Sequence, residues 1–429
     1  MTSGTALFTD HYELTMLTSA LRDGSAHRNS VFEVFARRLP GGRRYGVVAG
    51  TGRLAEALLE FRFSEDDLGF LQSAGAVDAE TRDYLRTWRF TGDVDGYCEG
   101  ELFFPGSPVL TVSGTFAETV IAETLVLSIL NHDCAIAAAA ARMVTAAGDR
   151  PIVEMGSRRA HEEAAVASAR AAYLAGFSAS SNLAAGLRYG VPTRGTAAHA
   201  FTLLHDTEAE AFAGQVATFG ADTTLLVDTY DITAGIRTAV EVAGPELAAI
   251  RIDSGDLGVL ARQARAQLDS LGATKTRIIV SGDLDEYAIA ALAAAPVDAY
   301  GAGTAVVTGS GHPTAGMVYK LVEVDGRPVA KRSQNKASSG GRKTAVRRHK
   351  PTGTAYEEVV AAQGVPRPLP HDRALQVPLL RRGEPVPGLP TLDASREHLR
   401  EALVTLPWEG LSLSQGDPAI PVVQQEAPR

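Results

Sequence analysis

The feature that most constrains the fold is a regular alternation of short apolar runs and helical stretches from about residue 150 to residue 303. Each apolar run ends in a polar or glycine-rich tip, as in TTLLVD (223–228), LAAIRID (247–253), TRIIVSGD (276–283) and VDAYGAG (297–303). A helix after each strand carries the chain back across the sheet, so this alternation predicts parallel strands. Because the strands share the same kind of polar tip, the pattern favours an α/β barrel whose strand ends open into one mouth.

Residues before about 140 show a different pattern, with short strands that end at Gly or Pro and one helix, TGRLAEALLEF, between them. This pattern predicts an antiparallel sheet domain with helical additions, and TDHYELTM (9–16) predicts the start of an amphipathic helix. After Thr314, the stretch YKLVEVDGRPVAKRSQ (319–334) predicts a β-hairpin with its turn at VDGRP. A length of 429 residues exceeds the size of one typical core, which also favours two domains.

Composition indicates which classes of partner the protein can bind and in which cellular compartment it is expected. A formal net charge of −9 at pH 7 argues against a nucleic-acid partner, because binding a phosphate backbone needs a broad basic surface. Cys98 and Cys134 are too few and too far apart for a disulfide framework or a thiolate metal site, which fits a reducing compartment. The start MTSGTALFTDHYEL lacks the pattern of a signal peptide, and no window reaches the ~20 apolar residues of a membrane span. We therefore expect a cytoplasmic protein without a membrane segment.

The stretch RIDSGDLG (251–258) concentrates charge where a buried strand ends and a helix begins. An arginine near the end of a buried strand is costly without a partner, so Arg251 is better explained by a site than by a surface ion pair. Ser254 or Asp256 is expected to cap the helix that follows. In barrels the working residues lie at the carboxyl ends of the strands. Here those ends carry Glu154, Asp228, Asp253, Ser281–Asp283 and Gly301–Gly303.

Two further stretches predict anion binding. EMGSRRAHEEAA (154–165) places Arg158 and Arg159 at the start of a helix, where backbone N–H groups and guanidinium groups together suit a phosphate or carboxylate. The alternative is a pair of solvated arginines beside the glutamates of that stretch. Small residues in SGD (281–283) and GAGT (301–304) end two successive strands, an arrangement that barrels use to hold a phosphate.

One histidine is a candidate for catalysis. GTAAHAF (195–201) presents His199 among small residues. Asp228, at the tip of the next strand in sequence, could hold one imidazole nitrogen and leave the other basic. The alternative is a packed histidine that orders a loop.

Together these stretches resemble nicotinate phosphoribosyltransferase, a family of type II phosphoribosyltransferases. The motifs GSRRA, GTxAH, LLVDTYD and RxDSGD occur in family order within roughly residues 5–345. The resemblance implies synthesis of nicotinate mononucleotide and pyrophosphate from nicotinate and phosphoribosyl pyrophosphate, coupled to ATP hydrolysis, as a step of NAD salvage. It also implies an irregular TIM-like α/β barrel with an N-terminal open-faced α+β sandwich domain, and a homodimer that shares its active sites.

On this basis we expect four segments in the chain. These are a sandwich domain with an N-terminal helix (1–140), the barrel (141–315), a return to the sandwich domain (316–405) and a C-terminal tail (406–429) that is only partly ordered.

The resemblance also implies roles for single residues in the ring pocket. Tyr12 of one subunit would stack on the pyridine ring bound by the other, with Met155 on the opposite face. Arg158 would bind a substrate anion, and Asn182 would border the ring substituent. Thr196 would contact substrate.

For the phosphates and the catalytic steps, the resemblance implies a second set of residues. Arg251 would bind substrate anions, and Asp228 and Asp253 would face Mg²⁺ and pyrophosphate. His199 would be phosphorylated by ATP, the co-substrate. The 5′-phosphate would be held by Ser281, Gly282, Gly301, Gly303 and Thr304. Lys331 and Lys336 would belong to the basic segment of the family.

Three alternatives stay open. Nicotinamide phosphoribosyltransferase has the same fold but tends to carry an aspartate where Asn182 stands, because an acid accepts from the amide N–H and repels a carboxylate. A lyase or aldolase with a Schiff-base lysine is disfavoured, since no predicted strand end carries a lysine. A non-catalytic binding protein would not need His199, Asp228 and Asp253.

Overall fold

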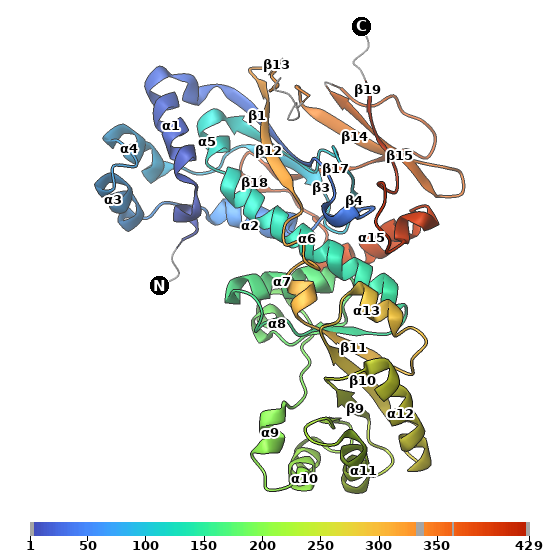
Figure 1. Ribbon diagram of the computed structural model, residues 1–429. Helices are drawn as coiled ribbons and strands as arrows, with labels where there is room; N and C mark the ends of the chain where they lie inside the picture. Colours follow the sequence, from blue (N-terminus) through green and yellow to red (C-terminus); the bar gives the residue numbers. More distant parts are fainter. Residues whose placement is uncertain (1–3, 332–338, 363, 426–429) are drawn as a thin grey trace. The chain divides into compact units, whose positions relative to one another are not determined.

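The computed structural model describes residues 4–331, 339–362 and 364–425. The chain divides into two compact units, a first unit of Met1–Ala138 and His312–Arg429 and a second unit of Ala139–Gly311 (Figure 1). The first unit therefore contains both ends of the chain. The predicted division into four segments stays a prediction.

The first unit is built on a seven-stranded antiparallel sheet in the order β13-β12-β1-β5-β3-β17-β18. Chain segments from before and after the second unit contribute to it, because β12 pairs with β1. The strands are β1 (Asn29–Ala36), β3 (Asp93–Tyr97), β5 (Leu110–Thr115), β12 (Met317–Val324), β13 (Arg327–Pro328), β17 (Gln376–Arg381) and β18 (Glu384–Pro385).

The predicted hairpin after Thr314 is confirmed. Strands β12 and β13 pair with Val324 opposite Arg327, and the two residues between them, Asp325 and Gly326, both have positive φ. Two positive φ angles are typical of the type I′ turn that joins strands with right-handed twist. On the same strand, Tyr319 stacks on Phe32 of β1 with ring centroids 4.6 Å apart.

A four-stranded sheet in the order β16-β14-β15-β19 and a two-stranded pair complete the strands of the first unit. β19 lies within the segment expected to be a partly ordered tail. It pairs in parallel with β15, and Ile420 just before it is buried. The segment therefore adds an edge strand to this sheet. The bounds are β14 (Lys343–His349), β15 (Ala355–Ala362), β16 (Arg373–Ala374), β19 (Val422–Gln425), β2 (Gly46–Val47) and β4 (Leu102–Phe103).

Several helices of the first unit contribute buried apolar side chains to its core. In α1, for example, Leu14 and Leu17 are buried one turn apart, as an amphipathic helix requires. The helices are α1 (His11–Asp23), α2 (Thr51–Glu60), α3 (Glu65–Ser73), α4 (Ala79–Thr87), α5 (Phe116–Val120) and α15 (Leu392–Val404), with 3₁₀ turns at Ala6–Phe8, Ser25–His27, Pro40–Gly42 and Trp408–Leu411.

The long helix α6 (Glu123–Ala147) runs from the first unit into the second in sequence. The helical stretch Phe116–Ala147 is apolar and long enough to cross a membrane, but 67% of its most apolar window is buried inside the protein. Burial of this kind is typical of a core helix.

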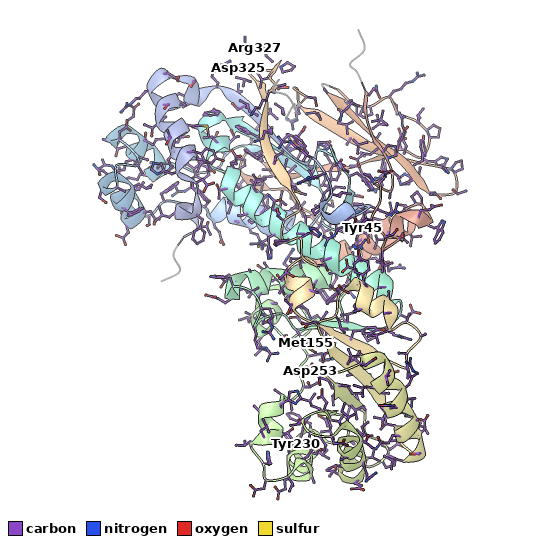
Figure 2. All side chains as sticks on the ribbon, viewed as in Figure 1. Tyr45, Met155, Tyr230, Asp253, Asp325 and Arg327 are labelled. Carbon is purple, nitrogen blue, oxygen red and sulfur yellow. The ribbon has the colours of Figure 1, made fainter. Side chains whose placement is uncertain are left out.

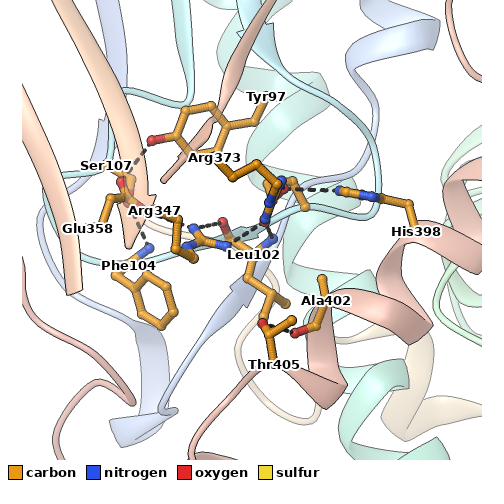
Figure 3. Close-up of polar contacts among 11 residues, drawn as sticks. Tyr97, Leu102, Phe104, Ser107, Arg347, Glu358, Arg373, His398, Ala402 and Thr405 are labelled. Atoms are coloured by element: carbon orange, nitrogen blue, oxygen red, sulfur yellow. Dashed lines mark hydrogen bonds and ion pairs between the residues drawn. The ribbon is translucent and has the colours of Figure 1, made fainter. Parts of the chain in front are cut away.

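Arginine and carboxylate side chains form a buried network in the first unit (Figure 3). Arg347 of β14 donates to Glu101 Oε1 at 2.5 Å and to Glu358 Oε2 at 2.7 Å. The second oxygen of Glu101 accepts from Arg373 at 2.5 Å and lies 3.0 Å from His398 Nε2, and Tyr97 donates to Glu358 Oε1. All four carboxylate oxygens of this network thus have partners.

The second unit confirms the predicted α/β class. Its six strands are all parallel, in the order β7-β6-β11-β10-β9-β8. The first strand, β6, pairs with the last, β11, which is the strand order of a barrel. Among the described residues no ladder joins β7 to β8; only an isolated bridge from Ser180 to Thr193 extends that edge.

The polar strand tips of the sequence lie where the prediction put them. The strands are β6 (Ile152–Glu154), β7 (Ala179–Ser180), β8 (Thr224–Leu226), β9 (Ala249–Ile252), β10 (Arg277–Gly282) and β11 (Ala299–Ala302). The helices between and after them are α7 (Glu162–Leu174), α8 (Leu183–Tyr189), α9 (His199–Leu203), α10 (Glu208–Phe219), α11 (Ile232–Ala243), α12 (Leu257–Ser270), α13 (Glu286–Ala291) and α14 (Thr304–Val307).

Candidate active site

Parallel pairing brings the strand ends of the second unit to one edge of the sheet. Leu226 at the end of β8 is in register with Arg251 of β9, and Ser281 of β10 is in register with Gly301 of β11. Residues that follow these strands must therefore lie close together. Met155 and Asp253 mark this end of the sheet (Figure 2).

Arg251 organises the centre of this edge. Its Nε donates to Ser281 Oγ at 2.7 Å, Nη1 to Thr196 Oγ1 at 2.9 Å and Nη2 to Asp253 Oδ1 at 2.6 Å. Ser281 in turn donates to Asp253 Oδ1 at 2.5 Å. One side chain thus connects β9, β10 and the loop before α9. The predicted site residues Arg251, Asp253, Ser281 and Thr196 are brought together.

The carboxyl group of Asp253 is held in its ionised form. Burial opposes ionisation, but the hydrogen bond from Ser281 and the charge of Arg251 outweigh it and lower the pKa of this carboxyl. The other oxygen, Oδ2, lies 4.0 Å from His199 Nε2.

Asp228 contributes the second carboxylate. Its Oδ2 accepts from the backbone N–H of Asp253 at 2.8 Å and from Ser254 Oγ at 2.9 Å. Its Oδ1 is buried and has no hydrogen-bond partner in the described part of the chain. A buried carboxylate oxygen without a partner is costly, which points to a ligand at this position. The helix cap expected from Ser254 or Asp256 comes from Asp256, which accepts from Val259 N at 3.1 Å.

His199 is the first residue of α9, and its ring faces the two aspartates. Nε2 lies 3.9 Å from Asp228 Oδ1, which exceeds hydrogen-bond distance. The hydrogen bond at Nδ1 comes instead from Thr229, whose Oγ1 is 3.0 Å away. Thr229 thus takes Nδ1, and Asp228 Oδ1 stands at ion-pair distance from Nε2 without a hydrogen bond to it, so the role of Asp228 in holding the imidazole stays a prediction.

Two aspartates are available for a hydrated magnesium ion, whose binding stays a prediction. Asp228 Oδ1 lies 3.9 Å and Asp253 Oδ2 4.0 Å from His199 Nε2, so both carboxylates are near this histidine. In residues 4–331, 339–362 and 364–425, no group of three or more His, Cys, Asp or Glu could hold a metal ion. Mg²⁺ needs no such cage, since it keeps several waters and takes one or two carboxylates together with substrate oxygens.

The residues expected at the pyridine ring lie around β6 and β7. Asn182 caps α8: its Oδ1 accepts from Ala185 N at 3.0 Å and its Nδ2 donates to Ser157 Oγ at 3.0 Å. The thioether of Met155 packs over Gly301, where an added Cβ would lie 2.8 Å from the sulfur. Arg158 is exposed in the turn that follows Met155.

The residues expected to hold a phosphate combine small size with unusual backbone geometry. Gly282 has φ +139°, and an added Cβ would lie 3.3 Å from Asp253 O. Gly303 caps α14 with φ −120° and ψ −97°, and Thr304 begins that helix. Backbone N–H groups at the ends of β10 and β11 are thus free of side chains that would block a close ligand.

Three expected residues lie outside this cluster. Tyr12, on α1, belongs to the first unit, and its side chain is 46% exposed, as a residue that reaches a second subunit must be. Lys331 is exposed in the same unit, and Lys336 lies outside the described residues. The structure describes a single chain, so a shared site stays a prediction.

Two polar residues near the site, Thr229 and Glu208, were not predicted from the sequence. Thr229 directly follows Asp228 in the motif LLVDTYD, so its position was the available signal. Glu208, the first residue of α10, has a buried oxygen with no partner among the described residues. Burial and the charges of Asp228 and Asp231 raise the pKa of Glu208. Its position on a helix, away from any strand end, gave no signal.

Comparison with known proteins agrees with this geometry. The family described as nicotinate phosphoribosyltransferase (NAPRTase) N-terminal domain matches residues 7–131. A nicotinate phosphoribosyltransferase of Mycobacterium tuberculosis is 64% identical over 425 residues, covering 97% of this chain and 94% of the relative, and one of Bacillus subtilis is 40% identical, covering 80% and 73%. The crystal structure of human nicotinic acid phosphoribosyltransferase matches with a TM-score of 0.84 at 27% identity, covering 97% of both chains. This chain belongs to the nicotinate phosphoribosyltransferase family.

Proposed function

We propose that this chain forms nicotinate mononucleotide and pyrophosphate from nicotinate and phosphoribosyl pyrophosphate, with coupled hydrolysis of ATP. The observation that carries the proposal is that Asp228 and Asp253, which follow two neighbouring strands, both lie near His199, while Arg251 binds Asp253. Displacing pyrophosphate from a ribose needs donors and a cation site for the negative charge of the leaving group. The relatives named above support the choice of nicotinate, since their names state this activity.

In the proposed reaction, the ring nitrogen of nicotinate bonds to C1 of the ribose. The bond from C1 to pyrophosphate breaks, and its electron pair leaves with pyrophosphate. Arg251 uses one N–H of each terminal nitrogen for Thr196 and Asp253. The second N–H of each is left for an oxyanion of the substrate. Asp228 Oδ1 and Asp253 Oδ2 would hold Mg²⁺, which, when bound, neutralises charge on pyrophosphate.

The same strand edge supplies the remaining substrate contacts in this proposal. Backbone N–H groups and hydroxyls would bind the 5′-phosphate, which needs no further charged side chain there. The residues are Ser281, Gly282, Gly301, Gly303 and Thr304.

His199 is proposed to accept the γ-phosphoryl group of ATP. With the proton on Nδ1 and donated to Thr229, the lone pair of Nε2 is free to act as a nucleophile. Nε2 bonds to phosphorus as the bond to ADP breaks, and water later releases inorganic phosphate from the ring. The carboxylates of Asp228 and Asp253 stabilise the positive charge that develops on the imidazole during the attack.

Asn182 favours an acid over an amide as the ring substituent. Its oxygen accepts from the N–H of Ala185 and one N–H of its amide donates to Ser157, so the second amide N–H is left to face a ligand. A donor pairs with a carboxylate and leaves the N–H of a carboxamide without an acceptor. This argument supports nicotinate over nicotinamide.

We further propose a cytoplasmic homodimer in which Tyr12 of one subunit stacks on the ring bound by the other. The exposure of Tyr12 supports this arrangement. Mixing inactive Tyr12→Ala and Arg251→Ala chains should restore activity, because a mixed dimer has one site with both defects and one with neither. Activity that stays absent after verified subunit exchange would rule out the shared site.

One assay tests the proposed reaction. Purified protein is given phosphoribosyl pyrophosphate and Mg²⁺ with nicotinate or nicotinamide, each with and without ATP, and the mononucleotide is measured. We expect nicotinate mononucleotide, more of it with ATP, and release of ADP. Preference for nicotinamide, or no mononucleotide from either base, would overturn the proposal.

A further inference from the structure

A buried carboxyl group lies directly beneath the residues expected at the pyridine ring. Glu154 is the last residue of β6, and its relative exposure is 0%. No ion pair to it is formed within the described ranges, and burial raises the pKa of its carboxyl despite hydrogen bonds from Ser180 and Gly156. An unpaired buried carboxyl is a costly choice for packing alone, since an apolar side chain of similar size would fill the space.

The two oxygens of Glu154 accept from two different segments. Oε1 accepts from the backbone N–H of Gly156, in the turn after β6, and Oε2 accepts from Ser180 Oγ at 2.5 Å, at the end of β7. The Ser180 hydroxyl then accepts from the backbone N–H of Asn182 at 2.9 Å. One hydrogen bond therefore links Glu154 to the Met155–Ser157 turn, and two hydrogen bonds in series link it to Asn182.

A second side-chain contact joins the same two segments. Asn182 Nδ2 donates to Ser157 Oγ at 3.0 Å, so a closed loop of contacts runs from Glu154 through Ser180 and Asn182 to Ser157 and back. The turn has little freedom to adjust, because an added Cβ on Gly156 would lie 2.2 Å from Val307 Cγ1 and 3.0 Å from Gly303 O. Glu154 and Ser180 are also in register in the parallel β6–β7 ladder, and the N–H of Ser181 donates to Glu154 O at 2.8 Å, so the carboxyl group adds a side-chain link between two segments whose backbones are already paired.

We propose that Glu154 is a positioning residue for the ring pocket, which sets the spacing between the Met155–Ser157 turn and Asn182. This inference rests on the proposed function, because it assigns the pocket to nicotinate. Both donors, Gly156 N–H and Ser180 O–H, point at a carboxylate that accepts from each. An amide at this position accepts with only one of its two atoms, so Glu154→Gln keeps the shape but disturbs one link of the loop.

The test separates ring binding from the rest of the reaction. Ser180→Ala removes the hydrogen bond between Glu154 and Ser180, and Glu154→Gln replaces its charged acceptor by a neutral amide. Ser180→Ala is expected to raise the KM for nicotinate about tenfold, the effect of one lost buried hydrogen bond, and Glu154→Gln is expected to raise it by less. The KM for phosphoribosyl pyrophosphate and kcat should stay within about twofold, since neither residue contacts the Arg251 cluster. The double variant should show no more than the effect of one single variant.

Glu286→Gln is the matched control. Glu286 is a buried residue of the same unit. Its carboxylate accepts hydrogen bonds from the side chains of Arg142 and Ser310. Its variant is expected to lower the melting temperature and leave the KM for nicotinate unchanged. Loss of stability in Glu154→Gln with an unchanged KM for nicotinate would show a purely structural role and overturn the inference. If Glu154→Gln does not fold, the KM of Ser180→Ala decides the matter alone.

Failure of this inference is distinct from failure of the proposed function. Wild-type protein that makes no nicotinate mononucleotide overturns the function. Wild-type protein that makes it, with variants of unchanged KM for nicotinate, overturns only the role of Glu154.

Discussion

Each unit contains a cluster of arginine and carboxylate side chains. The two clusters share their residue types but differ in burial and in how many of their carboxylate oxygens are paired. In the first unit, Arg347 is 0% exposed, and both oxygens of Glu101 and of Glu358 accept hydrogen bonds (Figure 3). In the second unit, the side chain of Arg251 is 13% exposed, and Asp228 Oδ1 has no partner within the described residues. A buried cluster whose carboxylate oxygens are all paired holds a fold together, whereas a partly exposed cluster with an open carboxylate oxygen can bind a ligand.

Electrostatics separate the two clusters further. Burial opposes the charge of Glu101, but Arg347, His398 and Arg373 overcome it and hold the pKa of that carboxyl well below its usual range. In the second unit, His199 is 40% exposed between two carboxylates, so a ligand from solvent can reach it. Exposure and an unfilled carboxylate oxygen mark the site more clearly than the presence of charge does.

The largest effect is expected for Arg347→Ala. The substitution leaves Glu101 and Glu358 buried without their shared cation, which costs about 3–5 kcal/mol of unfolding free energy. Denaturant unfolding followed by circular dichroism measures this loss. The protein that stays folded should keep wild-type kinetic constants, because Arg347 lies outside the Arg251 cluster. A variant of wild-type stability would contradict the structural role.

The second prediction reverses the pattern in the other cluster. Arg251→Ala removes a charge-assisted donor worth roughly 1.5–3 kcal/mol in the transition state, so kcat/KM should fall about 10- to 100-fold or more. Asp253 is partly exposed and can be solvated, so the melting temperature should change little. Steady-state kinetics and thermal unfolding on one preparation measure both quantities. Native melting with unchanged turnover would remove Arg251 from the site.

How much of this contrast could be predicted from sequence depended on the range of the contacts. The polar tip after each apolar run placed Asp228, Arg251 and Asp253 correctly at strand ends, because the signal lies in neighbouring residues. The Asp256 cap and the Asp325–Gly326 turn are equally local. The sequence could not show that a C-terminal strand joins β15, since such a pairing depends on packing across the chain.

Hydrogen-bond partners were harder to predict than positions. Asp228 and Thr229 are adjacent, and only the direction of each side chain decides which of them reaches His199. Glu154 was visible as a strand end, but its partners Gly156 and Ser180 belong to two segments whose separation is set by the fold. Side-chain direction in three dimensions is the information that a linear pattern lacks.

The third prediction tests the proposed phosphorylation of His199, in the second unit. Wild-type protein incubated with γ-labelled ATP should carry an acid-labile, base-stable phosphate, as phosphohistidine does. His199→Ala should lack the label and the stimulation by ATP but keep some ATP-independent synthesis, because the Arg251 cluster is intact. Thr229→Ala is a useful second variant, since it removes only the hydrogen bond at Nδ1. A His199→Ala protein labelled as strongly as wild type would move the phosphate elsewhere.

The smallest expected effect is on the acid stability of the Arg347 network in the first unit. Because the pKa of Glu101 is depressed in the folded state, its contribution to stability is present above the unfolded value, about 4.3, and is lost as pH falls through the folded value. One such group changes the unfolding free energy by about 1.4 kcal/mol per pH unit in that window. Denaturant unfolding of wild type should therefore show a loss below about pH 4.3 that is absent between pH 5 and pH 7. Glu101→Gln should be less stable at neutral pH but lose less on acidification, since it has no carboxyl to protonate. Equal acid slopes for the two proteins would show that other carboxylates, the partly exposed Asp253 among them, govern the acid response.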